Sequence, residues 1–426
     1  MSTLPAKRRF HYAYVVVSAG MLCIVGSLGI GRFGYNMLLP GMREGLRLSY
    51  TEMGLMVTGN FVAYMIAALL LGALAAKMGS RLVISTCTIF AGIVFFLVGF
   101  TMDFRYGLAM QILLGASTAG ANIPAFSIAS SWFAEKKRGA ATGLVIGGIG
   151  LGIVGTGLLV PLLISLYGPE GWRYGWHYLG IVIVVIGIIG GIFLRDSPYQ
   201  MGLAPVGSSE TPTGIPSQRT RGSALAWGSV YRSKKVLRMC LTMSLYGFAY
   251  IIYATYFTTY LTKEGGLSIA EAGQLWALLG VWGMSGGFIG GFLSDRIGRE
   301  KGMMVLLVVE AVAITLIALF RVMPVYYISL ALYGITNWGA TAVTAAAAGD
   351  YVGPRLAPAA MGMMSFVFAI GQALGPGIAG YIADTTGSFS PSFLISGLVM
   401  FLASFVAYTM TRMVRTQATE AVPVAD

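Results

Sequence analysis

Charged residues are scarce in this chain: only 10% of its 426 residues are Asp, Glu, Lys or Arg, whereas 56% are hydrophobic. A soluble globular domain carries about 25% charged residues. The low charge and the long uncharged runs exclude that class and indicate that the chain lies in a lipid bilayer. Membrane lipid is therefore the first expected partner.

Residues that bind metals or form disulfides are also few. Cys23, Cys87 and Cys240 lie in separate apolar segments without the spacing of a metal site or a redox motif, so we interpret them as packing residues. The sequence contains two histidines, shows no cluster of metal ligands, and places no nucleophile beside a base. These absences argue against an enzyme and predict no metal and no other cofactor.

What the chain does have is a series of apolar segments, each long enough to cross about 30 Å of hydrocarbon as a helix. Polar residues recur in them at three- and four-residue spacing, which favours helices over the alternating strands of a membrane β-barrel. The sequence therefore predicts an all-α membrane protein with twelve transmembrane helices. The predicted segments are residues 12–41, 51–76, 82–101, 104–134, 140–167, 173–194, 235–262, 268–294, 302–320, 325–351, 357–383 and 391–412.

Basic residues predict the topology, and a polar linker divides the chain. If both termini are cytoplasmic, 21 of the 28 Lys and Arg residues lie on the cytoplasmic side, as the positive-inside rule requires. The net charge of +12 then follows from topology and needs no nucleic-acid partner. Residues 195–234 have the Pro, Gly, Ser and Thr content of a flexible linker. It separates a six-helix bundle, residues 1–194, from a second bundle with a short tail, residues 235–426.

The two halves match at a constant offset of 219 residues. LSYTEMG at 48–54 aligns with LSIAEAG at 267–273, and Gly79, Gly115 and Gly120 align with glycines at 298, 334 and 339. A constant register across separate helix ends indicates a parallel duplication.

Two loop sequences, GALAAKMGSR at 72–81 and GGFLSDRIGRE at 290–300, resemble the paired loop signature of major facilitator superfamily transporters. The resemblance covers essentially the whole chain and implies two bundles around a central cavity lined by helices 1, 4, 7 and 10. It also implies that Asp295, Arg296 and Arg299 form a cytoplasmic latch in the outward-facing state. The first copy has Ala76 and Lys77 at the corresponding positions, so we assign the latch to the second half. Ordinary cytoplasmic charge is the alternative interpretation.

A glycine-rich segment tests the prediction that no cofactor binds. Gly150, Gly152 and Gly155 have the G-x-G-x-x-G spacing of a dinucleotide fingerprint. That motif requires a preceding strand, whereas these glycines lie inside a membrane-length apolar helix. We interpret them as sites of close helix packing.

Arg32 lies near the outer end of the first apolar segment, where inserting an arginine costs roughly 2.5–3.5 kcal/mol. Its counterpart at the offset of 219 is Ile251, so the duplicated architecture does not require a cation there. A guanidinium presents a planar fork of donors suited to carboxylate, sulfonate or phosphate. The sequence therefore predicts that Arg32 binds a small organic anion. A structural cation, neutralised by an acid or by helix-end carbonyls, is the alternative.

Polar side chains on the expected cavity-lining helices are predicted to support the anion. Several of these side chains are tyrosines that follow one another along one face of a helix. Such tyrosines also occur in ordinary packing, although a hydroxyl group in hydrocarbon needs a hydrogen-bond partner. The predicted substrate-binding residues are Arg32, Tyr35, Asn36, Asn122, Tyr250, Tyr333 and Asn337.

Smaller resemblances narrow the expected substrate. Arg32 with Pro40 is similar to the first-helix signature of organic-anion:cation symporters, although Gly31 replaces the expected Asp. SWFAEKKRGAATG at 131–143 and RDSPYQMGL at 195–203 resemble loops of oxalate/formate and monocarboxylate transporters. The Gly-Arg-Phe sequence of helix 1 resembles the bacterial group of facilitator transporters called the YbfB/YjiJ type.

Glu310 is the clearest acid at membrane depth, and a carboxyl group in hydrocarbon favours its protonated form. We therefore name it as the candidate for ion coupling, with Asp384 or a purely structural Glu310 as alternatives. The sequence predicts a monomeric secondary transporter of the bacterial inner membrane, which takes up a small carboxylate-type anion with protons or another cation by alternating access. Proton-coupled efflux of amphipathic drugs or metabolites, and a membrane sensor or enzyme, are the alternatives.

Overall fold

The computed structural model describes residues 11–208, 230 and 232–420, and this part of the chain is almost entirely helical. In these ranges the extended backbone contributes one isolated bridge, between Phe133 and Val206. The all-α prediction is therefore confirmed, and each predicted apolar segment is helical over most of its length.

The helices follow one another with short connections. In chain order they are α1 (Ala13–Ile24), the π-helix η1 (Val25–Gly34), α2 (Tyr35–Leu46), α3 (Tyr50–Met78), α4 (Ser80–Val98), α5 (Phe104–Trp132), α6 (Glu135–Tyr167), the 3₁₀ turn η2 (Gly168–Glu170), α7 (Gly171–Phe193), the 3₁₀ turn η3 (Pro198–Met201), α9 (Lys234–Lys263), α10 (Ile269–Ile297), α11 (Arg299–Leu319), α12 (Met323–Thr386) and α13 (Ser390–Glu420). Nine helical stretches among the described residues are long and apolar enough to cross a membrane.

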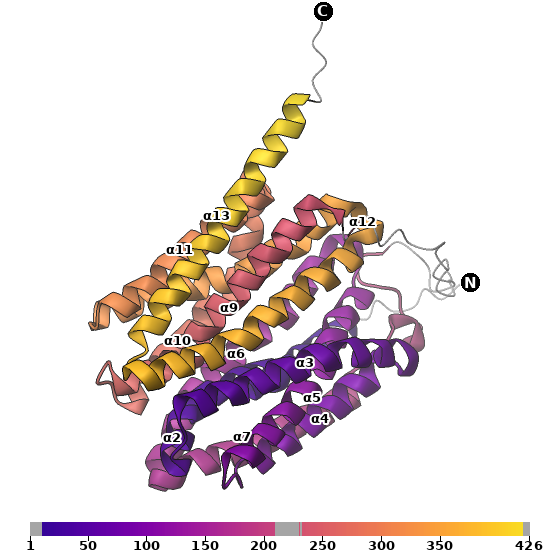
Figure 1. Ribbon diagram of the computed structural model, residues 1–426. Helices are drawn as coiled ribbons and strands as arrows, with labels where there is room; N and C mark the ends of the chain where they lie inside the picture. The colour runs from indigo at the N-terminus through magenta and orange to yellow at the C-terminus, as the bar shows by residue number, and fades with distance from the viewer. Residues whose placement is uncertain (1–10, 209–229, 231, 421–426) are drawn as a thin grey trace, which may run out of the picture.

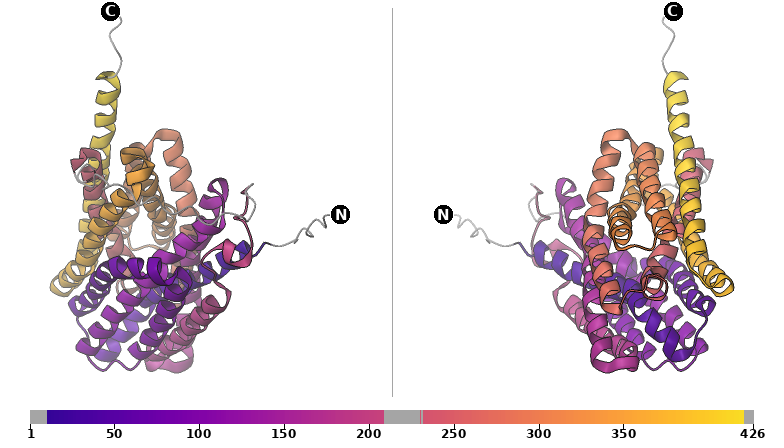
Figure 2. Two further views of the ribbon diagram at one scale, coloured as in Figure 1. Left: turned by 90° about the vertical axis from the view of Figure 1, so that its right-hand side faces the viewer. Right: turned by 90° about the vertical axis from the view of Figure 1, so that its left-hand side faces the viewer.

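Figure 1 shows α1 to α7, indigo to magenta, lying together below α9 to α13, which run from red to yellow. The two sets meet where α3 packs against α12 and α6 packs against α10. Figure 2 confirms this division from two other sides and shows the end of α13 projecting beyond the other helices.

The helix boundaries repeat at the offset of 219. Ser49 and Glu52 form a capping box that starts α3, and Ser268 and Glu271 form the same box at the start of α10. Each box satisfies backbone donors that a helix N-terminus leaves unpaired. Gly79 and its counterpart at 298 end these helices with the same φ of +93°, a conformation that favours glycine.

Close helix contacts repeat at the same offset. A side chain at Gly54 would collide with the Pro376 carbonyl, and a side chain at Gly273 would collide with the Gly157 carbonyl. These are equivalent pairs, because 54 and 157 become 273 and 376 when 219 is added. The contacts between α3 and α12 and between α6 and α10 are thus two copies of one interface.

Two helices are interrupted. α12 spans two predicted segments and breaks at Gly353, where φ is +76° and ψ is +163°. The first helix widens into η1, whose glycines include Gly29, packed against the backbone of Gly152. This contact supports the packing role predicted for the glycines of α6. π-helical turns often occur at functional sites, and η1 contains Arg32.

The two halves are joined by hydrogen bonds at one end of the molecule, the end of the α2–α3 turn. The Asp384 carboxylate accepts from the backbone N–H groups of Tyr50 and Thr51 at 2.9 and 2.7 Å and from the Thr51 hydroxyl. Toward the opposite end, no atom lies within 4 Å of a Cβ built at Gly143 or Gly291. The described residues therefore join the two halves by hydrogen bonds at the α2–α3 end, whereas these two glycines have no neighbouring atom in the direction of a side chain.

Candidate functional site

Arg32 is half-buried, and two aromatic rings of α3 hold its guanidinium. The Cζ atom lies 4.0 Å from the centroid of the Phe61 ring and 4.2 Å from that of Tyr64. Both distances are within the range of about 6 Å for a cation–π interaction. The glycines of η1 place the backbone near α6, and the arginine side chain extends to α3 on another side. Phe61 and Tyr64 were not predicted from the sequence.

The guanidinium has no anionic partner among the described residues. Its Nε and Nη2 atoms are buried without a hydrogen bond, and no ion pair includes Arg32. The arginine lines a cavity of about 10 Å³, which has room for about one water molecule. Two donors of a permanent cation thus lie unpaired beside a cavity between the two halves.

Three polar residues that the sequence analysis missed line this cavity. Asn60 of α3, Gln111 of α5 and Thr255 of α9 each have a buried polar atom without a partner in the described structure: Asn60 Oδ1, Gln111 Nε2 and Thr255 Oγ1. Asn60 and Gln111 align with Leu279 and Leu330 at the offset of 219. The alignment of the two halves, which singled out Arg32, therefore also shows that these two amides have apolar counterparts.

Tyr35 and Asn36 line the same cavity, but their polar groups already have partners. The Tyr35 hydroxyl donates to the Met53 carbonyl at 3.4 Å. Asn36 Nδ2 donates to the Ala254 carbonyl at 2.8 Å, and the Asn36 carbonyl accepts from the Thr258 hydroxyl at 2.6 Å. In this conformation Asn36 joins the first helix to α9.

The predicted residues of the second half form a separate network. The Tyr333 hydroxyl donates to the Tyr250 carbonyl at 2.9 Å, and the Tyr246 hydroxyl donates to Asn337. Gln372 donates to the Tyr250 hydroxyl. Tyr250 is close enough to Arg32 for an electrostatic interaction, so it connects this network to the arginine.

Asn122 is fully buried in α5 but does not belong to the lining of the cavity beside Arg32. Its Oδ1 atom accepts from the Ser27 hydroxyl at 2.7 Å, while its Nδ2 atom has no partner among the described residues. The structure therefore places the Asn122 side chain against Ser27 of η1.

Glu310 lies in α11 and is 0% exposed. Neither carboxyl oxygen has a hydrogen-bond partner in the described structure. Thr336 of α12 is a neighbour, and Tyr246 and Tyr333 are near enough for electrostatic interaction. The carboxyl group therefore lies inside the second half, beside the tyrosine network.

The predicted latch residues lie at the α3–α4 end and bind within their own half. Arg299 pairs with Asp295, and its Nε donates to Asp350 at 2.8 Å. The Arg296 guanidinium lies 4.2 Å from the centroid of the Phe292 ring. Among the described residues, these three side chains have no hydrogen bond or ion pair with the first half.

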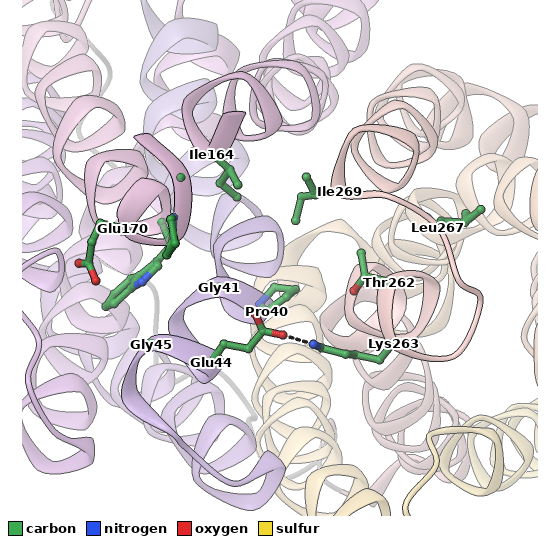
Figure 3. A pocket seen from close by; sticks show the side chains of 13 residues that line it. Pro40, Gly41, Glu44, Gly45, Ile164, Glu170, Thr262, Lys263, Leu267 and Ile269 are labelled. Atoms are coloured by element: carbon green, nitrogen blue, oxygen red, sulfur yellow. Dashed lines mark hydrogen bonds and ion pairs between the residues drawn. The ribbon is translucent and has the colours of Figure 1, made fainter. Parts of the chain in front are cut away.

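A larger pocket, about 410 Å³, lies at the α2–α3 end between the halves. Figure 3 shows Glu44 of α2 and Lys263 of α9 pointing toward one another and forming an ion pair beside Pro40. Positions 44 and 263 differ by 219, so the ion pair joins equivalent positions of the two repeats. Residues that approach their own counterparts in this way lie close to the axis that relates the halves.

Comparisons with known proteins find a matching family and relatives that cover most of the chain. A family model described as an uncharacterised MFS-type transporter, YbfB, matches residues 24–408. A probable sulfoacetate transporter of Cupriavidus necator is 25% identical over 92% of this chain and 93% of its own length. A hexuronate transporter of Bacillus subtilis is 23% identical over 91% of each chain. The crystal structure of a bacterial homologue of the human lysosomal transporter Spinster, inward-facing and unoccupied, superimposes with a TM-score of 0.76 at 18% identity, over 94% of this chain and 97% of its own.

Proposed function

Because the chain belongs to the family of uncharacterised YbfB-type transporters of the major facilitator superfamily, we propose that it is a secondary transporter for a small carboxylate-type anion. It acts in the bacterial inner membrane as a monomer, by alternating access. The named relatives support an anionic substrate, since two of them are described as transporters of sulfoacetate and hexuronate.

The proposed topology has twelve transmembrane helices, in bundles at residues 1–194 and 235–426 joined by residues 195–234, with both termini cytoplasmic. The distribution of basic residues supports this orientation. It places the α2–α3 end, with Glu44, Lys263 and Asp384, on the outside. The hydrogen bonds at that end then close the outside in the conformation described above, and we propose that it opens to the cytoplasm.

The anion site is Arg32, and its unpaired guanidinium is the observation that carries the proposal. A buried cation without a counter-charge is costly, whereas a carboxylate from the substrate would satisfy both free donors. The cavity in this conformation is too small for an organic acid, so we expect binding to require the helices around Arg32 to separate. Tyr35, Asn36, Asn122, Tyr250, Tyr333 and Asn337 are the proposed supporting residues.

Glu310 is the proposed coupling residue. A buried carboxylate without a partner is unfavourable, so we expect Glu310 to hold a proton in this conformation. Its place beside Tyr246 and Tyr333 supports a link to Tyr250, which lies near Arg32. Binding of this proton from the outside, and its release to the cytoplasm when the anion leaves, would couple uptake of the anion to the proton gradient.

Asp295, Arg296 and Arg299 are proposed to close the cytoplasmic side in the outward-facing state. The exposure of Asp295 and Arg296 is consistent with this role, and in the described structure the three residues form no hydrogen bond or ion pair with the first half. Asp295 is 64% exposed in its side chain, so it is accessible to a new partner when the ends approach.

A transport assay tests this function. Purified protein in sealed liposomes should accumulate labelled acids when a proton gradient is applied, and Arg32→Gln should abolish accumulation. Arg105→Gln is the matched control, because it also removes one positive charge but at an exposed position. Accumulation of cationic drugs instead of acids, insensitive to Arg32→Gln, would favour the efflux alternative. Absence of any transport would favour a sensor or an enzyme.

A further inference from the structure

Two buried amides beside Arg32 are not used by the anion site described above. Asn60 is 6% exposed and Gln111 is 2% exposed, and both line the cavity that contains Arg32. Asn60 Nδ2 donates to the Gln111 backbone carbonyl at 3.1 Å and to Gln111 Oε1 at 3.2 Å. The remaining atoms, the acceptor Asn60 Oδ1 and the donor Gln111 Nε2, have no partner among the described residues.

The fold itself does not require this pair. The equivalent positions in the second half hold two buried leucines, Leu279 and Leu330. The backbones pack in the same way in both halves, because Gly115 lies against the Asn60 carbonyl and Gly334 lies against the Leu279 carbonyl. Buried polar atoms in native proteins are usually hydrogen-bonded, so an amide pair where leucines suffice points to a ligand.

The chemistry of the two free atoms selects the group that binds them. A carboxylate only accepts and would leave Asn60 Oδ1 unpaired, whereas an ammonium only donates and would leave Gln111 Nε2 unpaired. A hydroxyl both donates and accepts, and so satisfies both atoms. We propose that Asn60 and Gln111 bind a hydroxyl of the substrate while Arg32 binds its anionic group, so that the transporter selects hydroxy acids over simple acids.

This proposal rests on the proposed function, since it assumes that Arg32 binds an anion. A water molecule also donates and accepts, and the cavity has room for about one. A purely structural water between the amides is therefore the competing interpretation. The two can be separated, because a structural water has no influence on the choice between acids that differ by one hydroxyl.

The experiment compares matched pairs of acids on the purified full-length protein by isothermal titration calorimetry. The pairs are lactate and propionate, D-gluconate and 2-deoxy-D-gluconate, and isethionate and ethanesulfonate. A site built to bond a hydroxyl disfavours the analogue that lacks it, because buried groups are left unpaired. In at least one pair, we expect the hydroxy acid to bind about ten-fold more tightly or better.

Variants then assign the preference to the two amides. The variants are Asn60→Leu and the double variant Asn60→Leu with Gln111→Leu. The double variant reproduces the leucine pair of the second half, so it is expected to fold. Both variants should lose the preference while binding the deoxy acid within about three-fold of the wild type. Ser117→Ala is the control: it removes a buried hydroxyl from the same helix as Gln111, which bonds only to carbonyls of its own helix in the described structure.

The outcomes are distinct. A wild-type protein that binds both members of every pair equally overturns the hydroxyl proposal but leaves the anion site standing. A preference that survives in the double variant, or an equal loss of affinity for both acids, also overturns it. Failure of the wild type to bind any acid removes the proposed function and this inference together.

Discussion

Replacing Arg32 by glutamine distinguishes a substrate-binding arginine from a structural one. The substitution removes the charge and retains a polar side chain of comparable reach. The structure gives the arginine two kinds of interaction, the cation–π contacts with Phe61 and Tyr64 and the buried unpaired donors Nε and Nη2. The first kind stabilises the empty protein and the second destabilises it, so the net effect can be worked out.

Each cation–π contact contributes about 0.5–2 kcal/mol, so losing both costs about 1–4 kcal/mol. Removing an unpaired arginine from hydrocarbon recovers roughly 2.5–3.5 kcal/mol. The two terms nearly cancel, and we expect the free energy of unfolding of the empty protein to change by no more than about 1–2 kcal/mol. The free energy of ligand binding has no opposing term, because removing one partner of a desolvated charge pair costs about 2–5 kcal/mol of affinity.

The assay is thermal melting of wild type and Arg32→Gln with and without the acid identified in the transport screen. A ligand at 100 times its Kd adds about 2.7 kcal/mol to the stability of a protein that binds it only when folded. The variant should melt near the wild-type temperature when empty and gain less than about 1 kcal/mol from the same ligand concentration, since its affinity falls by about thirty-fold or more. Arg32→Lys keeps the charge but loses the planar fork and should restore binding only in part.

The opposite pattern would refute the reasoning. If Arg32 ties the helices together, Arg32→Gln lowers the melting temperature of the empty protein while the remaining folded protein binds the acid with wild-type affinity. A destabilised variant of that kind would show that Phe61 and Tyr64 are the true partners of the arginine.

Three further predictions concern the elements around the site. Asp384→Ala should raise the reactivity of a cysteine introduced at the α2–α3 end, because the variant loses three hydrogen bonds that hold the two halves together at the start of α3. A cap of this kind contributes about 0.5–2 kcal/mol. Unchanged cysteine reactivity would contradict this prediction. Glu310→Gln should abolish accumulation driven by a pH gradient while leaving exchange of labelled for unlabelled acid, and intact pH-driven accumulation would exclude Glu310 as the coupling group. Asp295→Asn should slow transport while affinity in detergent changes less than about three-fold, because the latch changes the populations of states rather than the cavity; a wild-type transport rate would remove that role.

The fold could be predicted from the sequence because its signals are local and are repeated. Membrane-length apolar runs determine where helices form. The match of LSYTEMG to LSIAEAG predicted a duplication, and the structure shows what that match encodes: the same capping box, twice, at the starts of α3 and α10. The break at Gly353 and the π-helix η1 were not predicted, because both depend on backbone geometry that glycine permits without requiring.

The candidate site could be predicted only in part. Arg32 was identified because its cost in hydrocarbon is independent of its neighbours. Its aromatic neighbours were not, because Phe61 and Tyr64 look like ordinary residues of an apolar helix until packing brings them against the guanidinium. The Tyr333 hydroxyl donates to the Tyr250 carbonyl, a partner that sequence spacing does not specify.

The duplication separates what the fold needs from what the function needs. Positions such as 54 and 273, where both halves have glycine, maintain equivalent helix contacts and therefore serve the architecture. Arg32 aligns with Ile251, and Glu310 aligns with Ala91, so the two membrane-depth charges named here have apolar counterparts in an equivalent framework. Because the same framework holds together around an isoleucine and an alanine, neither charge is demanded by the helix packing. In the proposed mechanism, the symmetric framework therefore supplies the movement between states, and the asymmetric residues supply the binding chemistry.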